Sequence, residues 1–179
     1  MRIIAGKYKG KNLSEFSLGT TRPTADMVRE ALFDKIGFEI QGKICLDLFT
    51  GTGALGIEAL SRNAEFCYFV DVEKEAVKIV KKNIDMVKAS NFEILNFDYQ
   101  KALEHFKNAK IKFDVVFLDP PYKTNFAENA INFLKQNGLL NDDAFVVWEH
   151  DDTKLEYIKN NFSDSVTKKY GKKFLTYLY

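Results

Sequence analysis

The sequence predicts an α/β fold built on a seven-stranded, mostly parallel sheet. Apolar runs that suit strands alternate with amphipathic stretches that suit helices, a pattern that favours right-handed crossovers and a sheet covered on both faces. The last two runs are separated only by the turn at Gly171, which is too short for a crossover, so the final strand should run antiparallel to its neighbour. A chain of 179 residues with this composition suits one well-buried domain.

Each element is expected from the period of its apolar residues. The expected strands are residues 43–49, 66–71, 92–96, 114–119, 144–150, 165–170 and 173–179. The helices expected between them are 54–62, 73–88, 99–107, 126–137 and 153–161. A small hairpin over residues 2–13, turning between Gly6 and Gly10, comes first. An amphipathic helix, "TADMVREALFDKIG", follows it, with Thr24 as the expected N-cap.

Composition narrows the class of protein. The two cysteines, Cys45 and Cys67, stand in separate apolar runs, so we expect buried thiols and no metal or redox site. No apolar run approaches the ~18 residues of a membrane span, and no signal peptide is recognisable, so we expect a cytoplasmic protein.

The net charge is only +1, but two segments are basic and aromatic without any acid. Their cationic residues are Arg2, Lys7, Lys9 and Lys11 in "MRIIAGKYKGKNL" and Lys168, Lys169, Lys172 and Lys173 in "KKYGKKF". Each segment could bind nucleic acid, or it could be a solvated edge that discourages strand-to-strand association. The sequence leaves both interpretations open.

A glycine-rich loop follows the first strand. Gly51, Gly53 and Gly56 in "DLFTGTGALG" have the G-x-G-x-x-G spacing between a strand and a helix. Such a loop lets the backbone approach a nucleotide closely, and an acid about 20 residues on can bind the ribose hydroxyls. Asp71, at the end of the second strand, is that acid.

Asp47 indicates which nucleotide is bound. It lies four residues before Gly51, where its carboxylate would repel a pyrophosphate but would attract the ammonium and sulfonium of S-adenosylmethionine. The same residue could instead cap the turn that follows it. No lysine follows the glycines, which excludes a P-loop.

"DPPY", residues 119–122, ends the fourth strand at the edge where α/β folds bind ligands, beside the first strand. An exocyclic base amine is a poor nucleophile that gains positive charge as it is methylated, so fixed acceptors stabilise the transition state. Asp119 offers a carboxylate, Pro120 and Pro121 hold the backbone without a competing N–H, and Tyr122 can stack on a base. A simple loop after a buried strand would explain one proline but not all four residues.

Three segments, "FTGTGALGIEALSR", "FLDPPY" and "TRPTADMVREALFDKI", resemble the RsmD family, bacterial methyltransferases that modify N2 of a guanine in 16S ribosomal RNA. The resemblance runs from end to end and implies a Rossmann-like, seven-stranded fold that uses S-adenosylmethionine. It implies a catalytic domain, residues 41–179, and an N-terminal basic extension, residues 1–40, that holds RNA. Two differences are mild: Thr50 and Thr52 stand where Ala and Ser are common, and Asp71 is shorter than the frequent Glu.

The resemblance also assigns roles to residues. Asp47 and the loop at Gly51 and Gly53 would face the methionine part, Asp71 would hold the ribose, and Asp98 would lie near the adenine amine. The full set expected at the cofactor is Asp47, Phe49, Gly51, Gly53, Asp71, Val72 and Asp98, and the set expected at the RNA is Arg2, Lys7, Lys9, Lys11, Arg22 and Thr24. The expected partner is 16S ribosomal RNA, in the small subunit or an assembly intermediate, bound by a monomer.

Three alternatives remain. A DNA adenine-N6 methyltransferase would share "DPPY" but usually needs a target-recognition domain. A nicotinamide-dependent oxidoreductase would share the glycines. A non-catalytic RNA-binding module would explain the basic segments alone.

Overall fold

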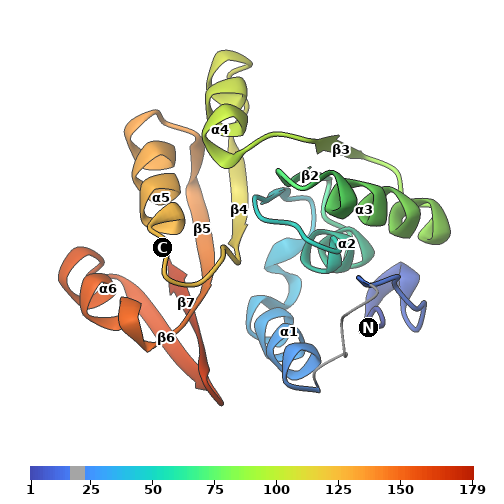
Figure 1. Ribbon diagram of the computed structural model, residues 1–179, viewed down its shortest axis with the longest axis horizontal. Coiled ribbons are helices and arrows are strands. Elements are labelled where there is room, and N and C mark those ends of the chain that lie inside the picture. Colours follow the sequence, from blue (N-terminus) through green and yellow to red (C-terminus); the bar gives the residue numbers. More distant parts are fainter. Residues whose placement is uncertain (17–22) are drawn as a thin grey trace.

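The computed structural model describes residues 1–16 and 23–179, and of residues 23–26 it describes only the backbone. Its centre is a seven-stranded sheet with the order β3-β2-β1-β4-β5-β7-β6 (Figure 1). The strands are β1 (Ile44–Asp47), β2 (Phe66–Val70), β3 (Phe92–Leu95), β4 (Phe113–Leu118), β5 (Leu140–His150), β6 (Ser165–Tyr170) and β7 (Lys173–Leu178).

The strand directions confirm the predicted fold class. Strands β1 to β5 pair in parallel, and β7 pairs antiparallel with both β5 and β6. The final hairpin therefore folds back so that β7 lies inside the sheet and β6 forms its edge. The lysines Lys168 and Lys169 lie on this edge strand, where charge discourages pairing with another chain.

In the described part of the chain six α-helices cover the sheet: α1 (Pro23–Ile36), α2 (Ala54–Ser61), α3 (Lys74–Val87), α4 (Tyr99–Asn108), α5 (Phe126–Gln136) and α6 (Leu155–Asn161). Helices α1, α2 and α3 pack on one face, and α4, α5 and α6 pack on the other (Figure 1). Strand β4 shows why both faces are apolar, since Val115 and Phe117 enter the first core while Val116 and Leu118 enter the second. Successive side chains of a strand point to opposite faces, so a strand covered on both sides must be apolar throughout.

The N-terminal hairpin contains a bridge between Arg2 and Asn12 and backbone hydrogen bonds such as the Ile3 N–H to the Lys11 carbonyl at 3.0 Å, and a 3₁₀-helix, Gly6–Tyr8, forms its tip. Helix α2 anchors this segment, because the buried carboxylate of Glu58 accepts the N–H groups of Ile4 at 2.8 Å and Ala5 at 3.0 Å. The hairpin also buries apolar side chains in the same core as α1, α2 and α3. We call residues 1–13 the N-terminal arm.

Most expected boundaries agree with the structure within two residues, and two expectations are wrong. Helix α1 begins at Pro23, so Thr24 lies inside the helix and is not its N-cap. Proline suits the first helical position because the N–H that it lacks would have no partner there. Strand β5 begins at Leu140 rather than 144, because Leu140 pairs with Phe113 before the register shifts. Arg22 lies outside the described residues.

The expectation that both cysteines are buried thiols is confirmed, since Cys45 and Cys67 are free and fully buried. Within residues 1–16 and 23–179, no helix is long and apolar enough to cross a membrane.

Gly6 and Gly10 allow a matched test of how the N-terminal arm is anchored. Both have positive φ, +80° and +83°, but a Cβ at Gly6 would lie 1.8 Å from the Ser61 carbonyl oxygen, whereas a Cβ at Gly10 would meet nothing within 4 Å. We expect Gly10→Ala to lower the free energy of unfolding by about 1–2 kcal/mol through backbone strain alone. Gly6→Ala should cost about 1–3 kcal/mol more, because the clash is with backbone. Thermal and urea unfolding measure both, and equal losses would contradict the close contact.

Candidate active site at the carboxyl edge of the sheet

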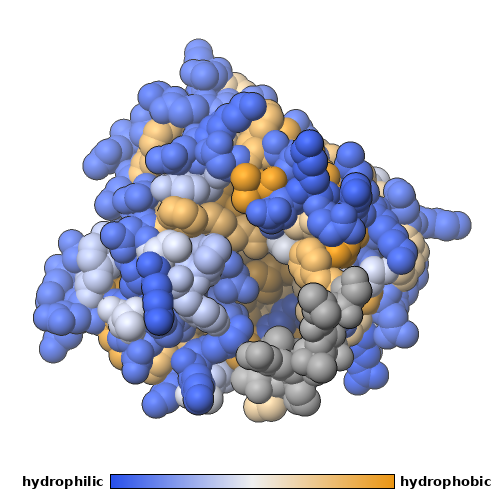
Figure 2. All heavy atoms as spheres, viewed as in Figure 1, coloured by the Kyte–Doolittle hydropathy of each residue, from blue (hydrophilic) through white to orange (hydrophobic). Residues whose placement is uncertain are grey.

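Two adjoining cavities open where β1, β2 and β4 end. The larger has a volume of about 760 Å³ and the smaller about 320 Å³, and they share the residues Phe49, Gly51, Asp119 and Lys173. Figure 2 shows a hollow on this face of the molecule, with apolar and hydrophilic residues around it. We call the two cavities together the cleft.

The glycine loop joins β1 to α2 and forms one wall of the cleft. Gly51 and Gly53 have φ of +54° and +79°, a region that L side chains rarely adopt, and Gly53 is the residue before the helix. Gly56 has another role, because a Cβ there would lie 2.3 Å from the Phe69 ring. Two glycines therefore make the turn and the third lets α2 pack closely on the sheet.

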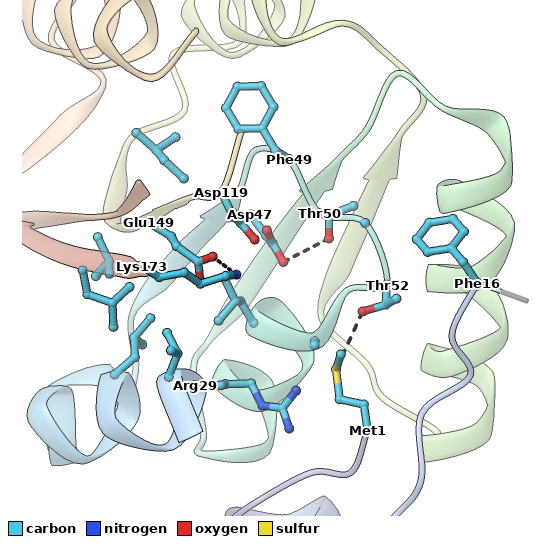
Figure 3. Close-up of a pocket in the computed structure, with 18 residues that line it drawn as sticks. Met1, Phe16, Arg29, Asp47, Phe49, Thr50, Thr52, Asp119, Glu149 and Lys173 are labelled. Atoms are coloured by element: carbon cyan, nitrogen blue, oxygen red, sulfur yellow. Dashed lines mark hydrogen bonds and ion pairs between the residues drawn. The ribbon is translucent and has the colours of Figure 1, made fainter. Parts of the chain in front are cut away.

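Asp47 ends β1 and is 2% exposed. Its Oδ2 accepts hydrogen bonds from the Thr50 hydroxyl and the Gly56 N–H, each at 3.0 Å, so the residue does stabilise the turn and the first turn of α2 (Figure 3). Both bonds reach the same oxygen, which leaves the lone pairs of Oδ1 for a ligand. Burial raises the pKa of Asp47 to about 7 despite these hydrogen bonds. A cation beside it would restore the charged form.

Asp71 connects the end of β2 to the glycine loop. Its Oδ2 accepts the Gly51 N–H at 2.8 Å and its Oδ1 accepts the Glu73 N–H at 2.9 Å. An ionised carboxylate has about four lone-pair sites, so Asp71 can still accept hydrogen bonds from two further hydroxyls. It lines the larger cavity together with Val72.

Aromatic rings form the far wall of the larger cavity. Phe49 lies 5.8 Å from Tyr99 and 6.3 Å from Phe126 between ring centroids, and Tyr99 lies 4.9 Å from Phe126. Asp98 caps α4 at the rim, where its Oδ1 accepts the Lys101 N–H at 2.9 Å. The cavity thus combines apolar walls with carboxylates at Asp71 and Asp98, which suits a flat heterocycle on a ribose.

Residues 119–122 follow β4 at the junction of the two cavities. Asp119 faces both of them and is exposed toward the cleft rather than sealed in the core. The surrounding protein, and after it the Glu149 carboxylate, raise the pKa of Asp119. Tyr122 is 48% exposed, and its hydroxyl donates to Glu149 Oε1 at 3.2 Å. Its ring is therefore held in place and remains accessible for stacking.

Sequence reasoning missed two residues of this site, Glu149 in β5 and Lys173 in β7. They form an ion pair beside Asp119 (Figure 3). Burial lowers the pKa of the Lys173 ammonium, but the charge and hydrogen bond of Glu149, together with Asp119 and Tyr122, raise it overall. Lys173 stood out in the sequence only as part of a basic segment, and the position of β7 beside β5 is what brings it here.

Four of the expected RNA-binding side chains lie outside the cleft. Arg2, Lys7, Lys9 and Lys11 are all exposed on the N-terminal arm. The ammonium groups of Lys7 and Lys11 lie 5.1 and 5.6 Å from the centre of the Tyr8 ring, and Lys11 donates to the Val87 carbonyl at 3.2 Å. The arm still reaches the cleft at its first residue, where Thr52 Oγ1 lies 3.9 Å from the Met1 sulfur (Figure 3).

Comparison with known proteins gives the family. The model of a family described as "Conserved hypothetical protein 95" matches residues 1–179. "Ribosomal RNA small subunit methyltransferase D" of Haemophilus influenzae is 39% identical over 158 residues, which cover 86% of this chain and 80% of that protein. The chain belongs to the RsmD family.

Solved structures agree with membership of the RsmD family. The structure named "Putative methyltransferase yhhF from Escherichia coli" is 31% identical and has a TM-score of 0.84, with 99% of this chain and 97% of that chain covered. A Thermus thermophilus 16S rRNA N2 G1207 methyltransferase, solved with AdoMet and guanosine, is 20% identical and has a TM-score of 0.74 over 91% of this chain and 44% of that one. This second likeness concerns the fold, which is that of the S-adenosylmethionine-dependent methyltransferases.

Asp47→Asn tests the charge of the cleft. The raised pKa of Asp47 means that the folded protein binds more protons than the unfolded chain between pH 4 and 7, so its stability falls as pH rises through this window. Asparagine can keep the two hydrogen bonds at its amide oxygen without the buried charge. We expect the variant to melt at a higher temperature than the wild type at pH 8, with a difference that shrinks toward pH 4.

The same variant should lose at least about tenfold in affinity for S-adenosylmethionine, because a charged partner of the ligand cation is gone. Calorimetry measures this, with NAD as the comparison ligand for the wild type. Tighter binding of NAD than of S-adenosylmethionine would contradict the assignment of the site. A variant melting below the wild type at pH 8 would contradict the buried charge.

Proposed function

We propose that this protein transfers a methyl group from S-adenosylmethionine to the exocyclic N2 amine of a guanine in 16S ribosomal RNA. The observation that carries the proposal is the position of Asp119, a carboxylate that faces both cavities of the cleft directly beside the glycine loop. Membership of the RsmD family supports it.

The cleft fits the cofactor. A cation would stabilise the charged form of Asp47 in the smaller cavity, and the ammonium of the methionine part is such a cation. Gly51 and Gly53 let the backbone approach the cofactor closely. In the larger cavity Asp71 would hold the ribose, while Val72 and Asp98 would lie at the adenine. When bound, S-adenosylmethionine supplies an electrophilic methyl group on its sulfonium sulfur.

The chain's own residues would act on the amine. Asp119 would accept a hydrogen bond from N2 and stabilise the positive charge that develops there. Pro120 and Pro121 hold the backbone rigid and carry no N–H that could compete for the amine's acceptors. The exposed ring of Tyr122 would stack on the base after it leaves its neighbours in the RNA.

Specific observations weigh against the alternatives. A pyrophosphate of NAD would lie beside the buried carboxylate of Asp47, which would repel it. A non-catalytic RNA-binding module has no need of the carboxylates gathered in the cleft. A DNA adenine-N6 methyltransferase would share Asp119 and Tyr122 but usually carries a separate target-recognition domain. The Haemophilus influenzae relative is named as a ribosomal RNA small subunit methyltransferase, which favours RNA over DNA as the substrate.

We further propose that the N-terminal arm, within an extension of residues 1–40 packed on a catalytic domain of residues 41–179, contacts RNA phosphates. The substrate would be the small ribosomal subunit or an assembly intermediate, which makes the cytoplasm the expected compartment. One copy of the chain carries both the cleft and the arm, so a monomer suffices.

Mapping of methylated nucleotides tests the proposal. 16S ribosomal RNA from cells with and without this protein should differ by one N2-methylguanine, and the purified protein should restore it to subunits from the deficient cells. Absence of any difference, or a methyl group on adenine, would contradict the proposal.

Asp119→Ala should lower the single-turnover rate of methyl transfer by about 10²–10³, as expected for the loss of one preorganised electrostatic partner. Affinity for S-adenosylmethionine should stay nearly unchanged, because the interaction forms with the amine. Asp119→Asn should be less damaging, because the amide oxygen can still accept a hydrogen bond. Asp143→Ala is the control, since Asp143 is an exposed acid at the opposite end of β5. Equal loss in the Asn and Ala variants would instead make Asp119 an obligatory proton acceptor.

Neutralising Arg2, Lys7, Lys9 and Lys11 together should weaken RNA binding in a salt-dependent way. Each lost phosphate contact makes the dependence of log K on log salt shallower by roughly 0.7 to 0.9, so four contacts amount to about 3. The matched control neutralises four exposed lysines elsewhere on the chain: Lys107, Lys110, Lys112 and Lys135. Filter binding to 16S ribosomal RNA over a range of salt measures both, and an unchanged slope in the arm variant would make the arm a solvated edge.

A further inference from the structure

Three charged side chains from three different elements meet at the base-binding end of the cleft. Asp119 follows β4, Glu149 lies in β5 and Lys173 begins β7. All three line the smaller cavity, in which Figure 3 shows Glu149 and Lys173 beside Asp119. The proposed mechanism assigns a role only to Asp119.

Glu149 is the middle member of this group. It forms an ion pair with Lys173 Nζ and lines the same cavity as Asp119, whose pKa its charge raises. The Tyr122 hydroxyl adds a third contact at 3.2 Å. The order of groups along the cavity is therefore carboxylate, carboxylate, ammonium.

Lone pairs and protons remain available on each member. Two N–H donors of a ligand, one for each carboxylate, would relieve the repulsion between Asp119 and Glu149. The Lys173 ammonium has three N–H bonds and needs only one for Glu149, so it can donate to an acceptor in the cavity. The side chains of Glu149 and Lys173 are 13% and 28% exposed, which makes them accessible from the cleft but well supported by the protein.

The edge of guanine presents the complementary order of groups. Starting from the N2 amine it offers a donor, then the N1–H donor, then the O6 acceptor. If the N2 amine lies at Asp119, the N1–H donor lies at the Glu149 carboxylate and the O6 acceptor lies at the Lys173 ammonium. Adenine with its amine at Asp119 would turn the lone pair of N1 toward Glu149, which repels it, and would leave buried polar groups unpaired.

We propose that Glu149 and Lys173 are the specificity-determining residues of this site, with Glu149 accepting the N1–H of the target guanine and Lys173 donating to its O6. This inference rests on the proposed function, since it takes the guanine amine to lie at Asp119. The ion pair between Glu149 and Lys173 would then have two roles: the two side chains stabilise one another in the empty protein and form hydrogen bonds to the base when it is bound.

The test compares two bases at one position. Once the methylated nucleotide is mapped, a synthetic RNA fragment around it is made with guanine or with 2,6-diaminopurine at that position. 2,6-Diaminopurine keeps the N2 amine, but its N1 is an acceptor and its 6-amine is a donor. The wild type should prefer guanine by at least about 10²-fold in kcat/KM, because the analogue leaves both reading groups mismatched.

The variants should alter this preference rather than the rate alone. Glu149→Gln can donate to the acceptor N1 of the analogue, so its preference should fall to about tenfold or less. Lys173→Met keeps the side-chain stem but no donor and should lose about tenfold in preference, whereas Lys173→Arg should retain most of it. Lys172→Met is the control, because Lys172 is the exposed neighbour in the same turn and should leave the preference unchanged.

Two further measurements make the outcomes distinct. Melting temperatures identify a variant that fails to fold. If Glu149→Gln does not fold, the base preferences of Lys173→Met and of its rescue Lys173→Arg test the inference by themselves. Affinity for S-adenosylhomocysteine should stay within about threefold of the wild type in both variants. An unchanged base preference in folded variants overturns this inference alone, as does a large loss of cofactor affinity with unchanged preference. Failure of the wild type to methylate the guanine fragment overturns the proposed function and the inference together.

Discussion

Strands β1 and β4 are separated in the sequence by two other strands but are neighbours in the sheet, with Asp47 beside Phe117. Because the pairing is parallel, both strands end at the same edge, and the residues that follow them share one crevice. The strand order also reverses direction here, since β2 and β3 extend on one side of β1 while β4 and β5 extend on the other. Open α/β sheets bind ligands at such a point. The glycine loop and residues 119–122 therefore meet although about 70 residues separate them.

This arrangement concentrates negative charge in the free protein. Asp47 and Asp119 both have raised pKa values, Asp47 because it is buried and Asp119 because of the surrounding protein and the Glu149 carboxylate. Glu149 adds a third carboxylate, and Lys173 and Arg29 are the cations that line the same cavity. A ligand that brings positive charge or N–H donors would stabilise the charged forms of these carboxylates. The same groups that would bind cofactor and base thus reduce the stability of the empty protein.

The elements of the fold were predictable because each depends on local periodicity and turn residues. Strand β4 is apolar except for Asp114, and the short segment at Gly171 can only form a tight turn, so the sheet class and the final hairpin followed from the sequence. The glycine loop, Asp47 and Asp119 were predictable because the loop and the strand ends have recognisable residue patterns. Glu149 and Lys173 were not, because their meeting depends on β7 inserting between β5 and β6, a long-range pairing that no local pattern encodes. Thr24 failed as a cap because a neighbouring proline competes for the start of the helix.

Helix α2 connects the glycine loop to the N-terminal arm, the two parts that the proposed function needs. It begins directly after Gly53 in the glycine loop, and its eight residues include Glu58 and Ser61, which accept hydrogen bonds from the backbone of the N-terminal arm. At 1.5 Å per residue the helix is about 12 Å long and acts as a rigid ruler between loop and arm. One inserted residue would turn Glu58 by about 100° around the helix axis and aim its carboxylate away from the arm. Gly56 to Ser61 of this helix are all buried, so its position is fixed by packing, and in the proposed function its length would set the distance between phosphates at the arm and the amine in the cleft.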